Sequence, residues 1–389
     1  MRSILDEQHI SLLRVAFKML VNSKKKFIGM LIGATFSAFI IMQQPGIYKG
    51  VTDRIVAQVR AITEIDLWVM GQDSHAFDLP TYFTPSDVYR VRSVPGVLWA
   101  VQLYRSWYQM KHPKTNQVRT WELVGVDPER LIGLPTTMVA GERDTIHRAN
   151  SMIIDGYSLK QMETDAKETV AIGDKMYEGR NTWTIAGITK PLRSYMYQPK
   201  VYMASNHIPN VLNRQSFILV KVKPDANVDN VAAEIERITH FDALTPEAFQ
   251  ARTLSFFRKK TPIVVNFITV AVLGFIIGLV VMWQIFSNFI LTHLHQFGML
   301  KMLGVSNSLL RKMVFFQAGI VGLCGYCLAL ILAVLFGLVF YDTIVAFHLT
   351  WRIALLGLLG AGIIVFLSSY FSMLKVIRMD TVELCRDTN

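Results

Sequence analysis

The chain has 389 residues, of which 52% are hydrophobic and 18% charged, and its mean hydropathy is +0.33. A disordered chain would have the reverse composition, so the hydrophobic excess predicts a membrane protein with a sizeable polar portion. The formal net charge of +11 suggests a nucleic-acid binder, but Lys and Arg beside membrane helices set orientation without needing an acidic partner. The positions of these charges therefore decide between the two explanations.

The first 26 residues predict a cytoplasmic amphipathic helix. Within the stretch 4–21, ILDEQHISLLRVAFKMLV, the apolar residues Ile10, Leu13, Phe17 and Leu20 recur at helical spacing. A helix of this kind lies on the inner leaflet of a membrane or packs on a partner protein, and the sequence leaves both interpretations open.

A first membrane span is expected at residues 27–48. Its strictly apolar part has only 16 residues, which is about 24 Å of helix and short for a span. A secretory signal peptide, with Lys24 to Lys26 as its charged flank, is the alternative interpretation. We favour an uncleaved anchor, because 26 residues precede the apolar part and no small-x-small cleavage site followed by a polar mature start is evident.

Residues 49–261 are predicted to form one large α+β domain with a helical stalk. The stretches 48–65 and 229–238 each place apolar side chains on one helical face, the second with Asp229 as its cap, and these two helices are expected to form the stalk. A short helix is expected to open at Thr84 and to end before Pro95. Strands are predicted at 67–70, 97–104, 120–126, 182–188, 200–204 and 217–222.

Three further membrane spans are expected at residues 262–291, 313–341 and 353–374. None of them contains Asp, Glu, Lys, Arg or His. Proton relays, ion sites and voltage sensors depend on such residues, so the sequence argues against a pump that draws its energy within these spans. The segments between and after the spans are a cytoplasmic coupling loop at 292–312, a short outer loop at 342–352 and a cytoplasmic tail at 375–389.

The distribution of charge predicts the orientation in the membrane. Segment 49–261 has a net charge of +4, whereas the other 176 residues have +7, and of their 13 basic residues only Arg352 lies on the side of the large domain. Basic flanks stay in the cytoplasm, so both termini are predicted to be cytoplasmic and the large domain periplasmic, in a bacterial inner membrane. Arg258, Lys259 and Lys260 oppose this pattern, but long domains cross membranes largely regardless of charge.

Small residues recur at helical spacing in three of the expected spans. The first span has Gly29, Gly33 and Ser37, the second has Gly274 and Gly278, and the fourth has Gly357 and Ala361. Such faces let helix backbones approach closely, either within one chain or between two copies. We expect a homodimer, because four helices and one exported domain are few for a transporter.

No catalytic or metal-binding constellation is visible in the sequence. The histidines have no ligand spacing, and no phosphate-binding loop of the form G-x-x-x-x-G-K-[ST] occurs. We therefore expect no catalytic residue, metal or cofactor on this chain, and we do not expect an enzyme.

Three stretches of the chain resemble one family of membrane proteins. FGMLKMLGVSNSLLRKMVFFQAGIVGLCG, at 297–325, is similar to the segment that joins the second and third spans of the MacB/FtsX permeases, the type VII ABC transporters. AFKMLVNSKKKFIGMLIG, at 16–33, resembles the family's entry into its first span, and YFSMLKVIRMDTVELCR, at 370–386, resembles the family ending. DLWVM at 66–70 and VPGV at 94–97 are similar to the branch that contains the cyanobacterial exporter permease DevC.

The resemblance implies a partner and a mechanism. Permeases of this family form homodimers, bind two copies of a separate ATP-binding subunit, which holds the ATP and Mg²⁺, and convert its closure into movement of the exported domain. The loop between the second and third spans is the family's coupling helix. The residues that this implies for contact with the ATPase are Phe297, Gly298, Met299, Leu300, Lys301, Leu303 and Gly304.

Two positions depart from the family pattern. Gln317 stands where the family usually has Glu, and Met302 stands where Ala is common. Both caution against assuming identical coupling.

The residues themselves agree with this resemblance, because a chain without a nucleotide loop or intramembrane charges must receive its energy from another polypeptide. The leading hypothesis is the permease subunit of an ABC exporter or extractor that acts on a lipid, lipoprotein or peptide at the outer face, with a periplasmic adaptor as a possible further partner. The alternative is a mechanotransmission protein that activates a periplasmic hydrolase and transports nothing.

Overall fold

A computed structural model of the chain describes residues 14–115, 117–166, 169–195, 198–208, 215–340 and 345–377. The chain divides into two compact units. The helical unit comprises Met1–Val51 and Pro262–Asn389, and the exported unit comprises Thr52–Thr261. Most of the predicted N-terminal helix, 4–13, and the family-like ending at 378–386 lie outside the described residues.

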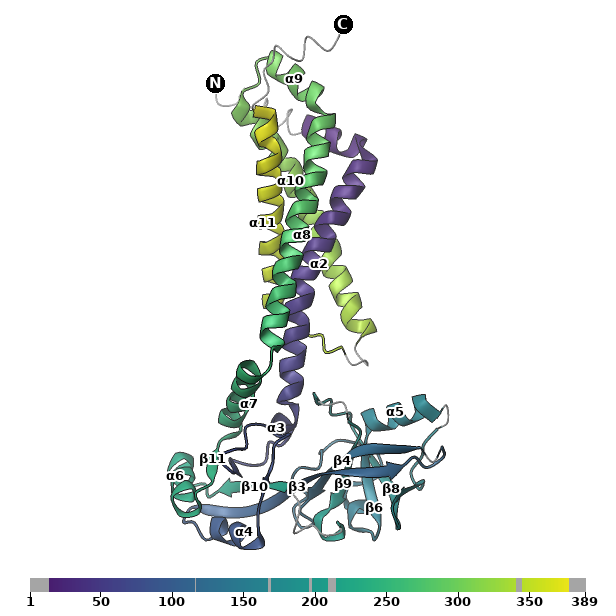
Figure 1. Ribbon diagram of the computed structural model, residues 1–389, viewed down its shortest axis with the longest axis vertical. Helices are drawn as coiled ribbons and strands as arrows, with labels where there is room; N and C mark the ends of the chain where they lie inside the picture. Colours follow the sequence, from purple (N-terminus) through teal and green to yellow (C-terminus); the bar gives the residue numbers. More distant parts are fainter. Residues whose placement is uncertain are drawn as a thin grey trace. The chain divides into compact units, whose positions relative to one another are not determined.

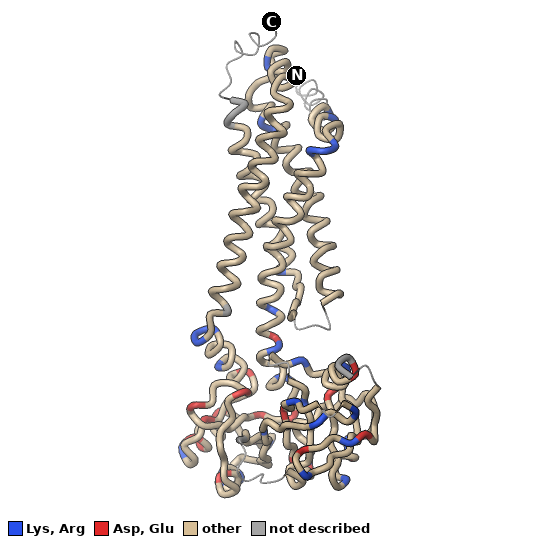
Figure 2. The backbone as a smooth tube through the Cα atoms, turned by 45° about the vertical axis from the view of Figure 1, so that its right-hand side comes forward, with Lys and Arg blue, Asp and Glu red and all other residues tan. Residues whose placement is uncertain are grey.

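Among the described residues, four helices are long and apolar enough to cross a membrane (Figure 1). They are α2 (Lys24–Ile55), α8 (Ile263–Thr292), α10 (Asn307–Val339) and α11 (Trp351–Ile377). The short helix α9 (Leu294–Met302) joins α8 to α10, and residues 14–22 form a helix ahead of α2. Within the helical unit, Lys and Arg gather towards the helix ends and leave the middle of the helices free (Figure 2), as an apolar solvent requires.

Helix α2 is longer than the apolar run that predicts it. It has 32 residues, about 48 Å at the helical rise, and it continues through Pro45. Polar residues follow the short apolar part, but the helix continues through them to Ile55. The helix therefore exceeds the thickness of about 30 Å of a hydrocarbon core.

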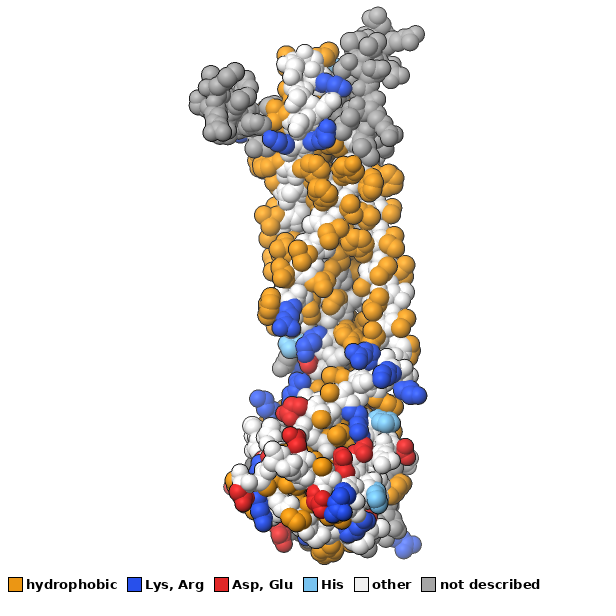
Figure 3. All heavy atoms as spheres, turned by 90° about the vertical axis from the view of Figure 1, so that its left-hand side faces the viewer, with side chains coloured by type: hydrophobic (Ala, Val, Ile, Leu, Met, Phe, Trp, Pro, Cys, Tyr) orange, Lys and Arg blue, Asp and Glu red, His pale blue; other side chains and the backbone are white. Residues whose placement is uncertain are grey.

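The membrane helices pack through two apolar clusters. One cluster includes residues of the helix 14–22 as well as α2, α8, α9, α10 and α11, among them Leu20, Phe286, Phe297 and Met313. The second joins α2, α10 and α11 through residues such as Met42 and Ala333. Outside these contacts the helices present hydrophobic side chains to the surroundings, as the face in Figure 3 shows.

The exported unit is built on one mixed sheet. Among the described residues, the sheet has eleven strands in the order β11-β1-β10-β3-β4-β9-β6-β8-β5, with β2 beside β10 and β7 beside β3 and β8. The pairs β4–β9 and β6–β8 are parallel, and the others are antiparallel. The strands are β1 (Leu67–Met70), β2 (Thr81–Tyr82), β3 (Val97–Lys111), β4 (Val118–Val126), β5 (Met138–Ala140), β6 (Ser151–Asp155), β7 (Lys175–Glu178), β8 (Asn181–Thr189), β9 (Lys200–Ala204), β10 (Gln215–Val222) and β11 (Asp242–Leu244).

Helices cover this sheet with separate apolar clusters. One cluster gathers α3 (Ala57–Ala61) and α7 (Pro246–Lys260) around Trp68, whose ring meets Phe217 and Phe249 at centroid distances of 5.4 and 5.3 Å. A second holds α4 (Pro85–Arg92) and α6 (Val228–Thr239), and a third holds α5 (Gly156–Ala166). The predicted fold class, four membrane helices with one large α-and-β domain between the first and second, is confirmed.

The predicted stalk helix at 229–238 is wrong in its role. A helix is present there, but α6 packs on α4 and the sheet through Val231 and Ile235, and its cap is Asn227, not Asp229. The helix that precedes α8 in the chain is α7, which the sequence did not predict. An amphipathic pattern identifies a buried face but not the surface that covers it.

Candidate functional site

The strongest candidate site is the segment from α8 to α10, where the sequence predicts contact with an ATPase. Helix α9 turns one face inward: Phe297 and Gly298 are buried, and Leu300 packs against the same cluster as Phe297. The opposite edge is exposed, and Met299, Met302 and Leu303 have exposed fractions of 42%, 59% and 81%. We call these three residues the α9 edge.

The structure does not expose all the residues that the resemblance implies for contact with the ATPase. Because α9 is a helix, successive residues point to different faces, so the predicted set Phe297 to Gly304 divides into two groups. Phe297, Gly298 and Leu300 hold the helix in place, whereas the α9 edge is available to another molecule. Lys301 is partly exposed and adds a cation beside that edge.

A glycine ends α9 and fixes the direction of the next helix. Gly304 has φ +86°, and its N–H donates to the carbonyl of Lys301 at 3.1 Å, while the N–H of Val305 donates to the carbonyl of Leu300 at 3.0 Å. These two bonds form a Schellman motif, which requires a left-handed residue. Ser306 then caps α10 by accepting from the N–H of Leu309. The backbone at the α9 edge is therefore well defined.

A second cluster of interest lies in the exported unit, where charged side chains of alternating sign form a buried row across four strands. Arg105 on β3 donates from Nε to Glu122 on β4 at 2.7 Å and from a terminal nitrogen to Asp78 at 2.8 Å. Lys200 on β9 lies with its Nζ 3.6 Å from the other oxygen of Glu122. Arg105, Glu122 and Lys200 are each at most 2% exposed.

The electrostatics of this charge row follow from burial and from its alternating signs. Burial alone would raise the pKa of Glu122, but Lys200 and Arg105 outweigh it and hold that pKa below its ordinary value. Burial raises the pKa of Asp155 on β6 to about 6, against the opposing effects of the N–H group of Leu192 and the charge of Lys200. Gln58 of α3 reaches Glu122 at 3.4 Å, so the row is also tied to the helix that follows α2.

Two family models match the chain. The model of the MacB-like periplasmic core domain matches residues 27–238, more than half of the sequence, and that of the FtsX-like permease C-terminal region matches residues 268–381. The chain belongs to the MacB/FtsX family of permeases. It is thus the membrane permease of an ABC transporter, a multi-pass membrane protein with an extracytoplasmic domain, and the family implies a partner ATP-binding subunit.

Solved structures similar to part of the permease include two extracytoplasmic domains. The extracellular domain of the noncanonic ABC-type transporter YknZ from Gram-positive bacteria is 16% identical and covers 46% of this chain and 99% of its own, with a TM-score of 0.35. The periplasmic region of MacB from Actinobacillus actinomycetemcomitans is 12% identical, with coverage of 52% and 96% and a TM-score of 0.36. A domain of a putative permease from Porphyromonas gingivalis is 16% identical, with coverage of 47% and 89% and a TM-score of 0.33. No protein with a curated description matches the sequence.

Four of the small residues singled out in the permease sequence, Gly33, Ser37, Gly274 and Gly278, lie where α2 meets α8 in the same chain. A Cβ on Gly274 would come within 2.3 Å of Ile40, and one on Gly278 within 2.5 Å of the hydroxyl of Ser37. A Cβ on Gly33 would lie 3.1 Å from the sulfur of Met282, whereas one on Gly29 would meet nothing within 4 Å. Gly33, Ser37, Gly274 and Gly278 therefore allow close packing within one chain. Gly29 has no such contact among the described residues.

Gln317, which stands where the family usually has Glu, lies buried on α10 of the permease. Its Nε2 donates to the carbonyl oxygen of Ala16 at 2.8 Å, and Ala16 and Leu20 are themselves buried. A carboxylate can only accept hydrogen bonds, so the amide is what lets α10 bind the helix 14–22 through this contact. The substitution thus fits the packing of the helical unit.

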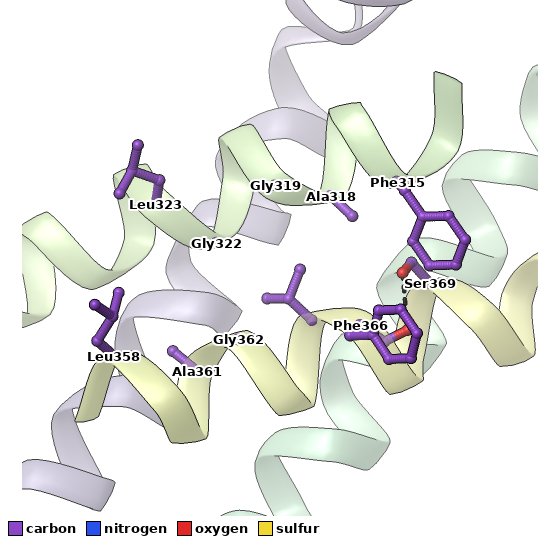
Figure 4. Close-up of a pocket in the computed structure, with 11 residues that line it drawn as sticks. Phe315, Ala318, Gly319, Gly322, Leu323, Leu358, Ala361, Gly362, Phe366 and Ser369 are labelled. Atoms are coloured by element: carbon purple, nitrogen blue, oxygen red, sulfur yellow. Dashed lines mark hydrogen bonds between the residues drawn. The ribbon is translucent and has the colours of Figure 1, made fainter. Parts of the chain in front are cut away.

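An apolar groove of about 400 Å³ lies between α10 and α11 (Figure 4). Gly319 and Gly322 face Ala361 and Gly362 across it, and the rings of Phe315 and Phe366 stack at one end with centroids 5.1 Å apart. None of the described residues that line the groove is charged, so it suits hydrocarbon and does not suit an ion or a sugar.

No group of three or more His, Cys, Asp or Glu side chains that could hold a metal ion occurs among the described residues. The sequence singled out the α9 segment through its resemblance to the family, but it missed the charge row. Arg105, Glu122 and Lys200 come from distant strands, and only the sheet order places them next to one another. The one available signal was a charged residue inside or directly after each of three strand-like runs.

Proposed function

We propose that the permease converts ATP hydrolysis by a separate cytoplasmic subunit into movement of its exported domain. The α9 edge is the observation that carries the proposal. It places three large apolar side chains in an exposed position on a helix whose other face is held in the core, which suits docking into a groove of a partner protein. The partner would bind ATP and Mg²⁺, since this chain has no phosphate-binding loop.

We place both termini in the cytoplasm and the domain in the periplasm of a bacterial inner membrane. The basic residues near α9 and ahead of α2 support this orientation, because such residues are retained on the cytoplasmic side. The α9 edge then faces the compartment that holds ATP.

The substrate that we propose is a lipid, a lipoprotein or a peptide taken up at the outer face. The apolar membrane helices and the groove between α10 and α11 support an apolar or amphipathic molecule. A periplasmic adaptor protein would complete an exporter of this kind.

The permease is proposed to act as a homodimer that contacts its second copy through α8. Only 11% of the most apolar stretch of α8 is buried within the chain, against 44% for α2. The free face of α8 therefore supports a contact with a second copy, with the remaining area facing lipid.

The docking proposal is tested by placing charge on the α9 edge. Leu303→Glu combined with Met302→Glu should lower co-purification of the ATP-binding subunit by about tenfold or more, because burying an unpaired carboxylate in an apolar contact costs several kcal/mol. Leu300 is unsuitable for this test, since it packs in the core and its replacement would disturb the fold.

Leu98→Glu is the matched control, because Leu98 is 53% exposed on β3 of the exported unit. It adds a surface carboxylate to the same chain and should leave co-purification unchanged. If the double variant retained full co-purification and full stimulation of ATP hydrolysis, the α9 edge would not be the docking site.

Mechanotransmission without transport is the second candidate. The observation in its favour is the anchoring of the two helices next to the membrane helices: Val59 of α3 and Phe249 of α7 are fully buried in the same cluster of the exported unit. Such anchors suit the transmission of force as well as transport. ATP-dependent movement of a fluorescent phospholipid or lipopeptide by the reconstituted complex would favour transport, and ATP-dependent activation of a cell-wall hydrolase without movement would favour this alternative.

A further inference from the structure

Two helix junctions of the helical unit meet at one hydrogen bond. Ser23 separates the helix 14–22 from α2, and its backbone carbonyl accepts from the N–H groups of Lys26 and Phe27, both at 2.9 Å. His293 separates α8 from α9, as the C-cap residue of α8 and the N-cap residue of α9. The hydroxyl of Ser23 lies 2.8 Å from Nε2 of His293.

The other ring nitrogen decides how this bond is made. Nδ1 of His293 lies 2.9 Å from the carbonyl oxygen of Phe289, which can only accept, so Nδ1 carries the proton. In the neutral ring Nε2 is then the acceptor, and Ser23 donates. The ring is 5% exposed and lies over the ring of Phe289 at a centroid distance of 4.4 Å, so its orientation is set by α8 itself.

A second polar contact and an apolar layer join the same two junctions. Lys26 donates from Nζ to the hydroxyl oxygen of Thr292, which in turn donates to the carbonyl of Asn288 at 2.9 Å. Next to this contact, Leu20 and Phe297 belong to one buried cluster. The start of α2 and the start of α9 are therefore joined by side chains, although they lie far apart in the sequence.

We propose that the Ser23–His293 hydrogen bond is the positioning contact that carries a displacement of α9 into α2. The inference rests on the proposed function, in which the partner ATPase moves α9. His293 is bonded to both helices, because its N–H donates to the carbonyl of Phe289 on α8 at 3.2 Å and its carbonyl accepts from the N–H of Phe297 on α9 at 3.0 Å. A displacement of α9 therefore moves this residue, and the bond to Ser23 passes the displacement to the residue just ahead of α2.

The test uses the full permease co-expressed with its ATP-binding subunit and reconstituted in lipid nanodiscs. All three native cysteines are replaced by Ala, and one new cysteine, Val139→Cys, is placed on β5, where Val139 is 64% exposed. The readout is the change that ATP causes in the rate at which a thiol reagent labels that cysteine. Co-purification of the ATPase is measured in parallel.

Ser23→Ala and His293→Phe should each reduce the ATP-dependent change by about 3- to 10-fold, the range expected for one lost hydrogen bond, while co-purification stays normal. His293→Phe keeps the aromatic ring on Phe289 and removes both nitrogens. The ATP-dependent change in the double variant should be no smaller than in the single variant that loses more of it, because both substitutions remove the same bond. Ser23→Thr retains a hydroxyl and should behave as the parent protein.

Ser287→Ala is the matched control, since Ser287 is buried and shares a hydroxyl contact of 3.2 Å with Ser372 between α8 and α11. This substitution should leave the ATP-dependent change in labelling rate within about twofold of that of the parent protein. A full response in Ser23→Ala, or losses that multiply in the double variant, would overturn the inference while leaving docking intact. If the parent protein did not bind the ATP-binding subunit, or if ATP did not change the labelling rate of its new cysteine, the proposed function and the inference would both be refuted.

Discussion

At the scale of single residues, the charge row of the exported unit depends on Glu122. Its carboxylate lies between Arg105 and Lys200, and all three side chains are out of water. Replacing Glu122 by Gln would leave Lys200 buried without a charged partner at that position. Removing one member of a buried pair typically costs about 3–5 kcal/mol, so Glu122→Gln should lower the thermal unfolding midpoint of the detergent-solubilised protein markedly.

A compensating change separates charge from shape at this site. Glu122→Gln combined with Lys200→Met removes both partners, and it should recover part of the stability that the single variant loses, because no unpaired ammonium remains. If the double variant were less stable than the single one by the full cost of Lys200→Met alone, the two residues would not be coupled.

Asp155 gives a prediction for the pH dependence of stability. Its pKa in the folded protein is about 6, above the ordinary 3.8, so folding takes up a proton between these values. The contribution of Asp155 to the free energy of unfolding has its full value below about pH 4. It falls by about 3 kcal/mol in all as the pH rises through 6.

The prediction is checked by comparing wild type with Asp155→Asn, which cannot titrate. The difference between their unfolding midpoints should change between pH 4 and 6, with wild type relatively more stable at the acidic end. A difference that stays constant over this range would show that Asp155 ionises normally in the folded protein.

At the scale of elements, the glycines of the membrane helices divide into packed and open positions. Gly274→Ala would place a methyl group 2.3 Å from the branched side chain of Ile40, so α2 and α8 would have to move apart. We expect a loss of about 1–3 kcal/mol, measured as a lower thermal midpoint in detergent.

Gly362→Ala is the control for this substitution. Gly362 also lies within a membrane helix, but a Cβ there meets nothing within 4 Å. Because Ala favours helix more than Gly does, stability should stay the same or rise slightly. Equal losses at both positions would mean that the effect comes from the helix backbone and not from the contact with Ile40.

Strong local patterns predicted many of the elements. Runs such as LWVM and KVYMA coincide with β1 and β9, and the helix that opens at Thr84 has the capping box that its Asp87 suggests. Helices α5 and α7 were missed, since their apolar residues are sparse and their positions depend on what they cover. Local pattern reports which side chains avoid water, while the packing partner is decided by the whole chain.

The candidate site was predictable only in part for the same reason. The resemblance identified the segment at 297–304, but which of its side chains stay exposed depends on the helix 14–22 and on α10, which pack against α9 through Leu20 and Met313. His293 is one of the histidines without ligand spacing, so no sequence pattern singled it out. Its contact with Ser23 joins residues that no spacing rule connects.

At the scale of the whole molecule, the proposed homodimer can be tested through the free face of α8. In a chain without native cysteines, Ile276→Cys, at a position 49% exposed in the membrane helix, should form a disulfide between two copies on oxidation. A disulfide needs the two Cα atoms within about 7 Å of each other, so the two copies of α8 must touch to give this product.

Leu332→Cys on α10 is the control, with a similar exposed fraction of 46%. It should remain monomeric under the same oxidation. Cross-linking at Leu332 and not at Ile276 would place the interface on α10, and cross-linking at both would indicate random collision in the membrane.

The strand order of the exported unit determines when each strand can pair during synthesis. Strand β1, LWVM, lies between β10 and β11, which leave the ribosome only after most of the domain has been made. At about 5–20 residues per second, β1 waits on the order of ten seconds for its neighbours. During that time a fully apolar strand is outside the membrane with both edges unpaired, a state that favours aggregation. Secretion of this domain should therefore depend on an extracytoplasmic chaperone more than secretion of a domain whose strands pair in sequence order.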